Sequence, residues 1–283
     1  MQRVILLLVW FAVCAAAQTS VWKVTYAGKT LYLGGTVHIL RDSDYPLPAA
    51  FDQAFASADS LVFETDIAAM NSPEAAMQIQ ALLMYGPSQS LRDTLHRKTY
   101  LALKKYAVQN GVPMQMLERM KPPLVIMTLM NLELQRFGLT APGVDQYYFS
   151  RASLSGKRVQ WFESVREQVE MLSNIGREDA DGMIMENLEE LKEYKSVFRQ
   201  MLSAWRDGKT DTLMAIGRKF LMNESPADYR RLIVERNRKW MAKLKPMLQS
   251  RETEFVLVGA LHLVGPEGLI AQLKRQGYRV EQL

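Results

Sequence analysis

The 283-residue chain contains one cysteine, Cys14, and only three histidines. Cys14 directly follows an apolar run over residues 4–13 that is typical of a signal peptide, so we expect neither a disulfide nor thiolate catalysis in the mature protein. No other apolar run approaches the ~20 residues that a transmembrane helix needs, and no tract rich in glycine and serine marks a linker. The few histidines therefore stand out, because imidazole suits both proton transfer at neutral pH and metal binding.

The first 17 residues have the three parts of a secretory signal. Arg3 supplies a positive charge, residues 4–13 form the apolar core, and three alanines at 15–17 form a cleavage site. An uncleaved anchor is one alternative, and a lipoprotein is disfavoured because Val13 is large for a position before a lipid-acceptor cysteine. We predict a signal peptide over residues 1–17, one domain over residues 18–283, and export to the periplasm or the exterior.

Charged residues of both signs are interleaved along the chain. The net charge of +5 arises from 35 Lys and Arg against 30 Asp and Glu. This pattern is typical of a solvated surface, so we expect no nucleic-acid partner. The sequence also lacks His-Glu-x-x-His, Gly-x-Ser-x-Gly and a phosphate-binding glycine loop, which gives no support to a zincin, a serine hydrolase of that type or a P-loop enzyme.

Strand patterns occur near both ends of the chain, and helical patterns dominate between them. A hairpin is predicted from strands over residues 21–26 and 31–35, and the chain closes with a strand, a helix and a strand over residues 254–258, 267–276 and 278–283. Two further strands are predicted over residues 61–65 and 158–162. Helices are predicted over residues 48–58, 89–109, 165–174, 180–204, 210–222 and 226–248. The expected fold is α/β, with a sheet built from both chain ends and a large helical middle over roughly residues 70–250.

The same short pattern occurs at the ends of two predicted strands. Each copy has an apolar run, a glycine, two residues and a histidine: Gly35 precedes His38, and Gly259 precedes His262. The glycine permits a sharp turn or a close approach to the backbone. One such pattern is often only structural, but a matched pair at the two ends of one domain predicts that both histidines converge on one site.

Glu64 ends another apolar strand, although a carboxylate is rarely buried without a partner. If this strand runs parallel to the one before His38, their carboxyl ends share the edge where α/β sheets bind ligands. Two histidines and a carboxylate suit a divalent metal with positions left for water. We predict a metal site of His38, His262 and Glu64; the alternative is that Glu64 caps a helix starting near Asp66.

Three further residues are candidates for supporting roles, and the third histidine is not. Glu163 also ends a predicted strand and is a candidate supporting residue or general base, or else an ordinary helix-capping carboxylate. Arg236 suits an oxyanion or a substrate carboxylate, unless it belongs to a solvated charge run. Asp145 is either a helix N-cap or an acid behind the metal ligands. His96 lies beside two basic residues and is predicted to be a surface histidine.

Together these segments resemble the TraB/GumN/TIKI family over nearly the whole mature chain. The matching blocks are the two Gly-x-x-His motifs and the segments around Glu64, Lys121-Pro122-Pro123, Gly143-Val144-Asp145, Phe162-Glu163-Ser164, Glu235-Arg236-Asn237 and residues 265–280. Two prolines after Lys121 replace a more usual Pro-aromatic pair. The resemblance implies a fold related to the erythromycin-esterase/ChaN-like proteins and a metal-dependent, protease-like activity of His38, His262 and Glu64.

We therefore predict an exported metal-dependent hydrolase that acts on a peptide or protein, with zinc, manganese or cobalt as the metal. Glu64, Glu163 and Arg236 are the predicted catalytic residues. One alternative is a non-catalytic protein that binds a peptide or a haem-like ligand, and another is a family member without activity.

Overall fold

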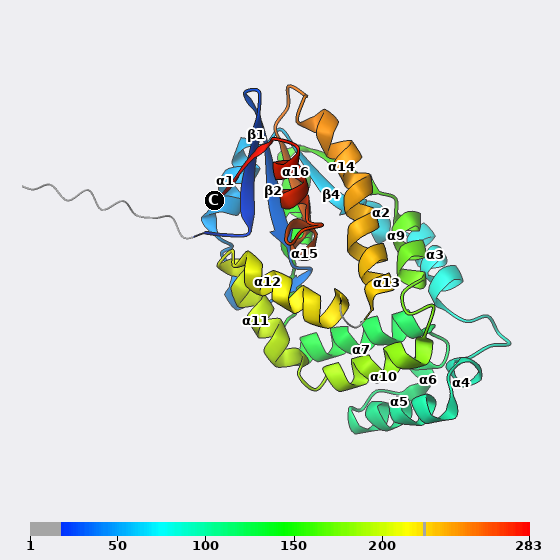
Figure 1. Cartoon of the computed structure of the whole chain (residues 1–283). Helices are drawn as coiled ribbons and strands as arrows, with labels where there is room; N and C mark the ends of the chain where they lie inside the picture. The colour runs from blue at the N-terminus through cyan, green and yellow to red at the C-terminus, as the bar shows by residue number, and fades with distance from the viewer. Residues whose placement is uncertain (1–17, 223–224) are drawn as a thin grey trace, which may run out of the picture.

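A six-stranded mixed sheet forms the centre of the computed structural model, which describes residues 18–222 and 225–283 (Figure 1). The predicted signal peptide thus lies outside the described residues. The strand order is β6-β4-β7-β2-β1-β8, with bounds β1 Val21–Tyr26, β2 Lys29–Thr36, β4 Ser60–Thr65, β6 Arg158–Glu163, β7 Glu254–Gly259 and β8 Arg279–Gln282. Both ends of the chain contribute to this sheet, as predicted.

The direction of the strands determines where the site forms. β6, β4, β7 and β2 are parallel neighbours, whereas β1 is antiparallel to both β2 and β8. The carboxyl ends of the four parallel strands therefore meet at one edge of the sheet. The predicted hairpin is present, because Ala27 and Gly28 both have positive φ in a two-residue turn between β1 and β2.

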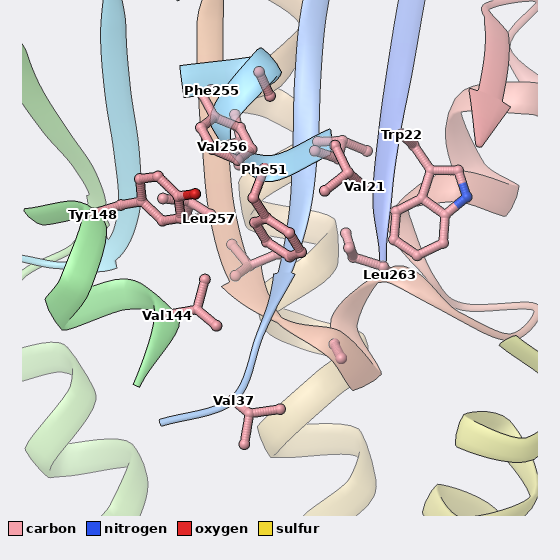
Figure 2. Packing of buried hydrophobic residues seen from close by; sticks show 14 of the residues in the cluster. Val21, Trp22, Val37, Phe51, Val144, Tyr148, Phe255, Val256, Leu257 and Leu263 are labelled. Carbon is pink, nitrogen blue, oxygen red and sulfur yellow. The ribbon is translucent and has the colours of Figure 1, made fainter. Parts of the chain in front are cut away.

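Different helices cover the two faces of the sheet. On one face, α1 (Ala49–Ser57) and α8 (Val144–Ser155) bring Phe51 and Tyr148 against Phe255 of β7 (Figure 2). On the other face, the short helix α15 (Ala260–Leu263) packs onto β2. A Cβ on Gly35 would lie only 3.2 Å from Cα of Ala260, so the bare backbone of β2 allows this close approach.

The remaining helices form a lobe on the side toward which β2 points (Figure 1). Their bounds are α2 Ile67–Met70, α3 Pro73–Leu83, α4 Leu91–Thr94, α5 Arg97–Gln109, α6 Met114–Leu117, α7 Pro122–Arg136, α9 Val165–Ser173, α10 Ala180–Glu190, α11 Tyr194–Arg206, α12 Thr210–Gly217 and α13 Pro226–Tyr229. A second hydrophobic cluster, separate from that of the sheet, joins α5, α7 and α10. None of the described helices has the length and apolar character needed to cross a membrane.

Two predicted helices are broken in the structure. The helix predicted over residues 89–109 is divided into α4 and α5 at Leu95 and His96, and the one predicted over residues 180–204 is divided into α10 and α11. Neither break contains a proline or a glycine. Leu95 and Leu191 at the two breaks are buried in the second hydrophobic cluster, so tertiary packing ends these helices where local propensity would continue them.

The end of the chain is α14 (Glu235–Met247), β7, α15, α16 (Leu269–Arg275) and β8. α13 and α14 are joined through a π-helical turn over Arg230–Val234, so the helix predicted over residues 226–248 is helical throughout. The predicted strand-helix-strand block is also present. β8 runs in the same direction as β7, but β2 and β1 lie between them.

Candidate functional site

The parallel strand ends open into a cavity of about 750 Å³ between the sheet edge and the helical lobe. His38, Glu64, Arg236 and His262 lie together at its sheet side. The opposite wall is mostly apolar and comes from α7, α10, α11 and α12, with Met127, Met130, Met183, Met201, Phe198 and Leu213 among its residues. The two histidines and Glu64 thus line one cavity, and their role as metal ligands stays a prediction.

His262 lies in α15, where its side chain is 6% exposed. Its Nδ1 is 2.8 Å from Oδ1 of Asn237. The amide nitrogen of Asn237 donates to the carbonyl oxygens of His262 and Glu267, so Oδ1 must be the acceptor for the ring. His262 therefore carries its proton on Nδ1 and presents a lone pair on Nε2. Burial lowers the pKa of His262 to about 3, which keeps the ring neutral.

His38 is the opposite case, because its side chain is 69% exposed. Its Nδ1 is 3.0 Å from a carboxylate oxygen of Asp145 in the first turn of α8. The start of α8 is held there by the Val144 N–H, which donates to the carbonyl oxygen of Val37. The charge of Asp145 raises the pKa of His38 to about 9, so the ring is an imidazolium at neutral pH. It must lose the proton on Nε2 before that nitrogen can bind a metal.

Arg236 links the other members of the site. Its Nη1 is 3.1 Å from Nε2 of His262, and its Nη2 is 2.6 Å from Oε2 of Glu64 and 2.9 Å from Oε2 of Glu163. Glu64 also accepts from the backbone N–H of Gly259 at 2.7 Å. Burial by itself raises the pKa of Glu64, but the Arg236 guanidinium, the two imidazoles and the Gly259 N–H together outweigh it and lower that pKa to about 2. The buried trio of Arg236, Glu64 and Glu163 thus carries a net formal charge of −1.

Glu163 has both carboxylate oxygens engaged. Nε of Arg236 lies 3.0 Å from Oε1 and 3.1 Å from Oε2, and Nε1 of Trp240 donates to Oε1 at 2.9 Å. The Trp240 ring stacks on Phe162 and lies 4.4 Å from the ring of His262, centroid to centroid. These contacts favour a role for Glu163 in holding Arg236, and a role as general base stays a prediction.

Asn237 and Trp240 are functional candidates whose roles the sequence interpretation missed. Both lie on the buried face of α14, together with Arg236 and Leu244. Helical spacing could have identified both residues, because the polar residues 236 and 237 lie on the same helix face as the apolar residues 240 and 244. Polar side chains on the buried side of a helix need partners: Arg236 binds the ends of β4 and β6, and Asn237 binds His262 of α15.

The structure also decides between the capping alternatives. Asp66, not Glu64, caps α2, and Ser164 with Glu167, not Glu163, caps α9. The N-cap of α8 is Gly143, so Asp145 does not cap that helix and instead binds His38. His96 is exposed, as predicted, and its Nδ1 lies 3.0 Å from Oδ2 of Asp181.

The donor types suit a divalent cation, but a guanidinium lies among them. Nδ1 of each imidazole is bonded to a side-chain oxygen, so Nε2 is the nitrogen that would bind a metal. Glu64 adds a carboxylate. In this conformation Arg236 donates to both His262 and Glu64. Within residues 18–222 and 225–283, no three His, Cys, Asp or Glu side chains are close enough to form a ready metal cage. In the conformation described, Arg236 therefore occupies the atoms of His262 and Glu64 that a cation would bind.

Fold and site together define a mixed α/β protein with a polar histidine, glutamate and arginine site at the carboxyl edge of its parallel strands. The chain belongs to the TraB/PrgY/gumN family, whose model matches residues 20–282. It is similar to the uncharacterised protein YbaP of Escherichia coli K12 and to its namesake in Shigella flexneri. Each is 24% identical over 246 residues, which is 86% of this chain and 87% of the relative. No solved structure matches the chain significantly.

Proposed function

We propose that the protein is an exported metal-dependent hydrolase that cleaves peptides. The observation that carries this proposal is that Nδ1 of each histidine is bonded to the oxygen of another side chain, Asp145 or Asn237. Both histidines line a cavity that Glu64 also lines. Anchoring of this kind is characteristic of metal-binding imidazoles. The net negative charge of the buried Arg236, Glu64 and Glu163 trio also favours an added cation.

In this proposal His38, His262 and Glu64 would hold zinc, manganese or cobalt after the Arg236 guanidinium has shifted from His262 and Glu64 while staying bound to Glu163. When bound, such a cation polarises a carbonyl group and acidifies water to a pKa of ~7 in favourable sites. Asn237 keeps the lone pair of His262 on Nε2. Glu163 keeps Arg236 at the site, where the guanidinium can stabilise negative charge that develops on the substrate. We also propose that the fold is related to the erythromycin-esterase/ChaN-like proteins, on the resemblance and on the parallel strand ends.

The apolar wall of the cavity supports a substrate with large apolar side chains. Its volume falls within the range of roughly 300–1,000 Å³ for ligand pockets. The same wall favours the second candidate function, a non-catalytic protein that binds a peptide or a haem-like ligand. The two differ in turnover: a binding protein saturates without cleaving its ligand, and haem would give a Soret absorbance band.

The test is cleavage of a peptide mixture, followed by mass spectrometry, with zinc, manganese, cobalt or a chelator. We expect chelator to stop cleavage, and we expect His38→Ala, His262→Ala and Glu64→Gln each to reduce it to background. His96→Ala is the matched control, because His96 is exposed and lies outside the cavity lining. Cleavage that is indifferent to chelator, or equal in all four variants, would contradict the proposal.

A further inference from the structure

The outer face of α5 combines basic and apolar side chains. This helix contains Arg97, Lys98, Lys104 and Lys105 but no aspartate or glutamate. Among residues 18–222 and 225–283, none of the four basic side chains forms an ion pair. α5 therefore presents a patch of positive charge with no acidic residue on the same helix.

Two large apolar residues are exposed at the centre of this patch. Leu101 is 49% exposed and Val108 is 70% exposed. With about 100° of rotation per residue, these two side chains lie roughly 20° apart around the helix axis. On the same geometry Arg97 and Lys104 flank them on one side, and Lys98 and Lys105 flank them on the other.

The opposite face of α5 is already covered. Leu103 and Ala107 are buried in the hydrophobic cluster formed with α7 and α10. Figure 1 places α5 at the end of the molecule farthest from the sheet, with α7 and α10 between it and the cavity. The charged and apolar face is therefore directed away from the rest of the fold, and no described element packs over it.

We propose that this face of α5 docks onto the surface of a bilayer containing anionic lipids, with the helix lying parallel to the membrane plane. Leu101 and Val108 enter the boundary between headgroups and acyl chains, while the flanking lysines place their stems along it and their ammonium groups among the phosphates. The central apolar pair with basic residues on both sides favours a lipid surface over a polyanion, which needs charge alone. This proposal does not depend on the hydrolase activity.

The test is co-sedimentation of the chain from Gln18 onward, which includes every described residue, with vesicles of phosphatidylcholine with or without phosphatidylglycerol. We expect binding only to the anionic vesicles, and weaker binding at higher salt. At about fivefold per charge, Lys104→Gln with Lys105→Gln should weaken binding roughly 25-fold. The matched control is Lys274→Gln with Arg275→Gln, which removes two adjacent positive charges from α16 and should change binding much less.

A second double variant separates a membrane from a polyanion. Leu101→Ser with Val108→Ser keeps every charge, and we expect it to weaken vesicle binding by about tenfold, since apolar burial is lost. Thermal melts show whether each variant is folded. The proposal is overturned if the unmodified chain ignores anionic vesicles or binds neutral ones equally. Vesicle binding that survives the serine variant, together with equally tight binding of heparin, would identify a polyanion site instead.

Discussion

The two Gly-x-x-His segments differ in almost everything except sequence pattern. His38 is exposed at the cavity, bound to a carboxylate and raised in pKa, whereas His262 is buried, bound to an amide and lowered in pKa to about 3. The glycines differ too: Gly35 makes room for α15, and Gly259 donates its N–H to Glu64. The repeated motif therefore places two imidazoles at one edge, and their different surroundings give them opposite charge states.

The largest expected difference between the two segments is in the buried network around His262. Replacing Arg236 by Met leaves two carboxylates and Nε2 of His262 without their shared partner, and we expect a loss of about 3–5 kcal/mol in the free energy of unfolding. Chemical denaturation measures it. The control is Arg279→Met, which removes a surface pair with Glu281 and should cost less than about 1 kcal/mol. Equal losses would show that the network does not stabilise the fold.

The opposite pKa shifts predict opposite dependence of stability on pH, measured without added metal. The lowered pKa of His262 means that the unfolded chain binds more protons between about pH 3 and 6.5, so stability falls as pH decreases through that window. The slope is at most about 1.4 kcal/mol per pH unit. The raised pKa of His38 stabilises the fold below pH 6.5, and that contribution is lost as pH rises toward about 9.

Denaturation curves across pH for His262→Gln and His38→Gln test this. The first variant should make the free energy of unfolding less dependent on pH on the acid side. The comparison is made above pH 5 to avoid the titration of carboxylates. The second should flatten the alkaline side by a smaller amount, because His38 is exposed and its interaction is screened. Parallel profiles for both variants would contradict the assigned charge states.

The two glycines should also respond differently to a methyl group. Gly35→Ala places a Cβ 3.2 Å from the backbone of Ala260, which cannot move without shifting α15 and His262, so we expect a cost of about 1–2 kcal/mol. Gly259→Ala meets a carboxylate oxygen of Glu64 at 3.2 Å, which can move more easily, and should cost less. Gly86 is the control, since nothing lies within 4 Å of its added Cβ. A larger loss of thermal stability for Gly259→Ala than for Gly35→Ala would contradict this prediction.

The smallest expected effect on stability comes from the partner of His38. Asp145→Asn removes a half-exposed charge interaction and should cost less than about 1 kcal/mol. It should nevertheless lower the pKa of His38, because the charge of Asp145 is the main cause of its increase. Titration of the histidine ring protons by NMR measures this, and three histidines are few enough to assign by single substitutions. An unchanged pKa would mean that Asp145 does not control His38.

Much of the sheet was predictable because its strands carry a local signal. The runs at β2, β4 and β7 are apolar and β-prone, and their boundaries agree with the predicted ones to within about two residues. The breaks at Leu95 and Leu191 were not predictable, because contacts in the second hydrophobic cluster end those helices without a proline or glycine. The role of Trp240 was not predictable for the same reason, because it contacts Glu163 of β6 and His262 of α15, which are distant in sequence.

The sequence by itself placed His38, Glu64 and His262 at or shortly after the ends of apolar strands, and the parallel pairing of those strands then brings the three residues to one edge. Only the tertiary structure decided what each of them is chemically. Asp145 and Asn237 reach the histidines from other helices, and Arg236 reaches Glu64 across 172 positions of the chain. Charge state depends on burial and on neighbouring charges in space, and neither is encoded in the spacing of a motif.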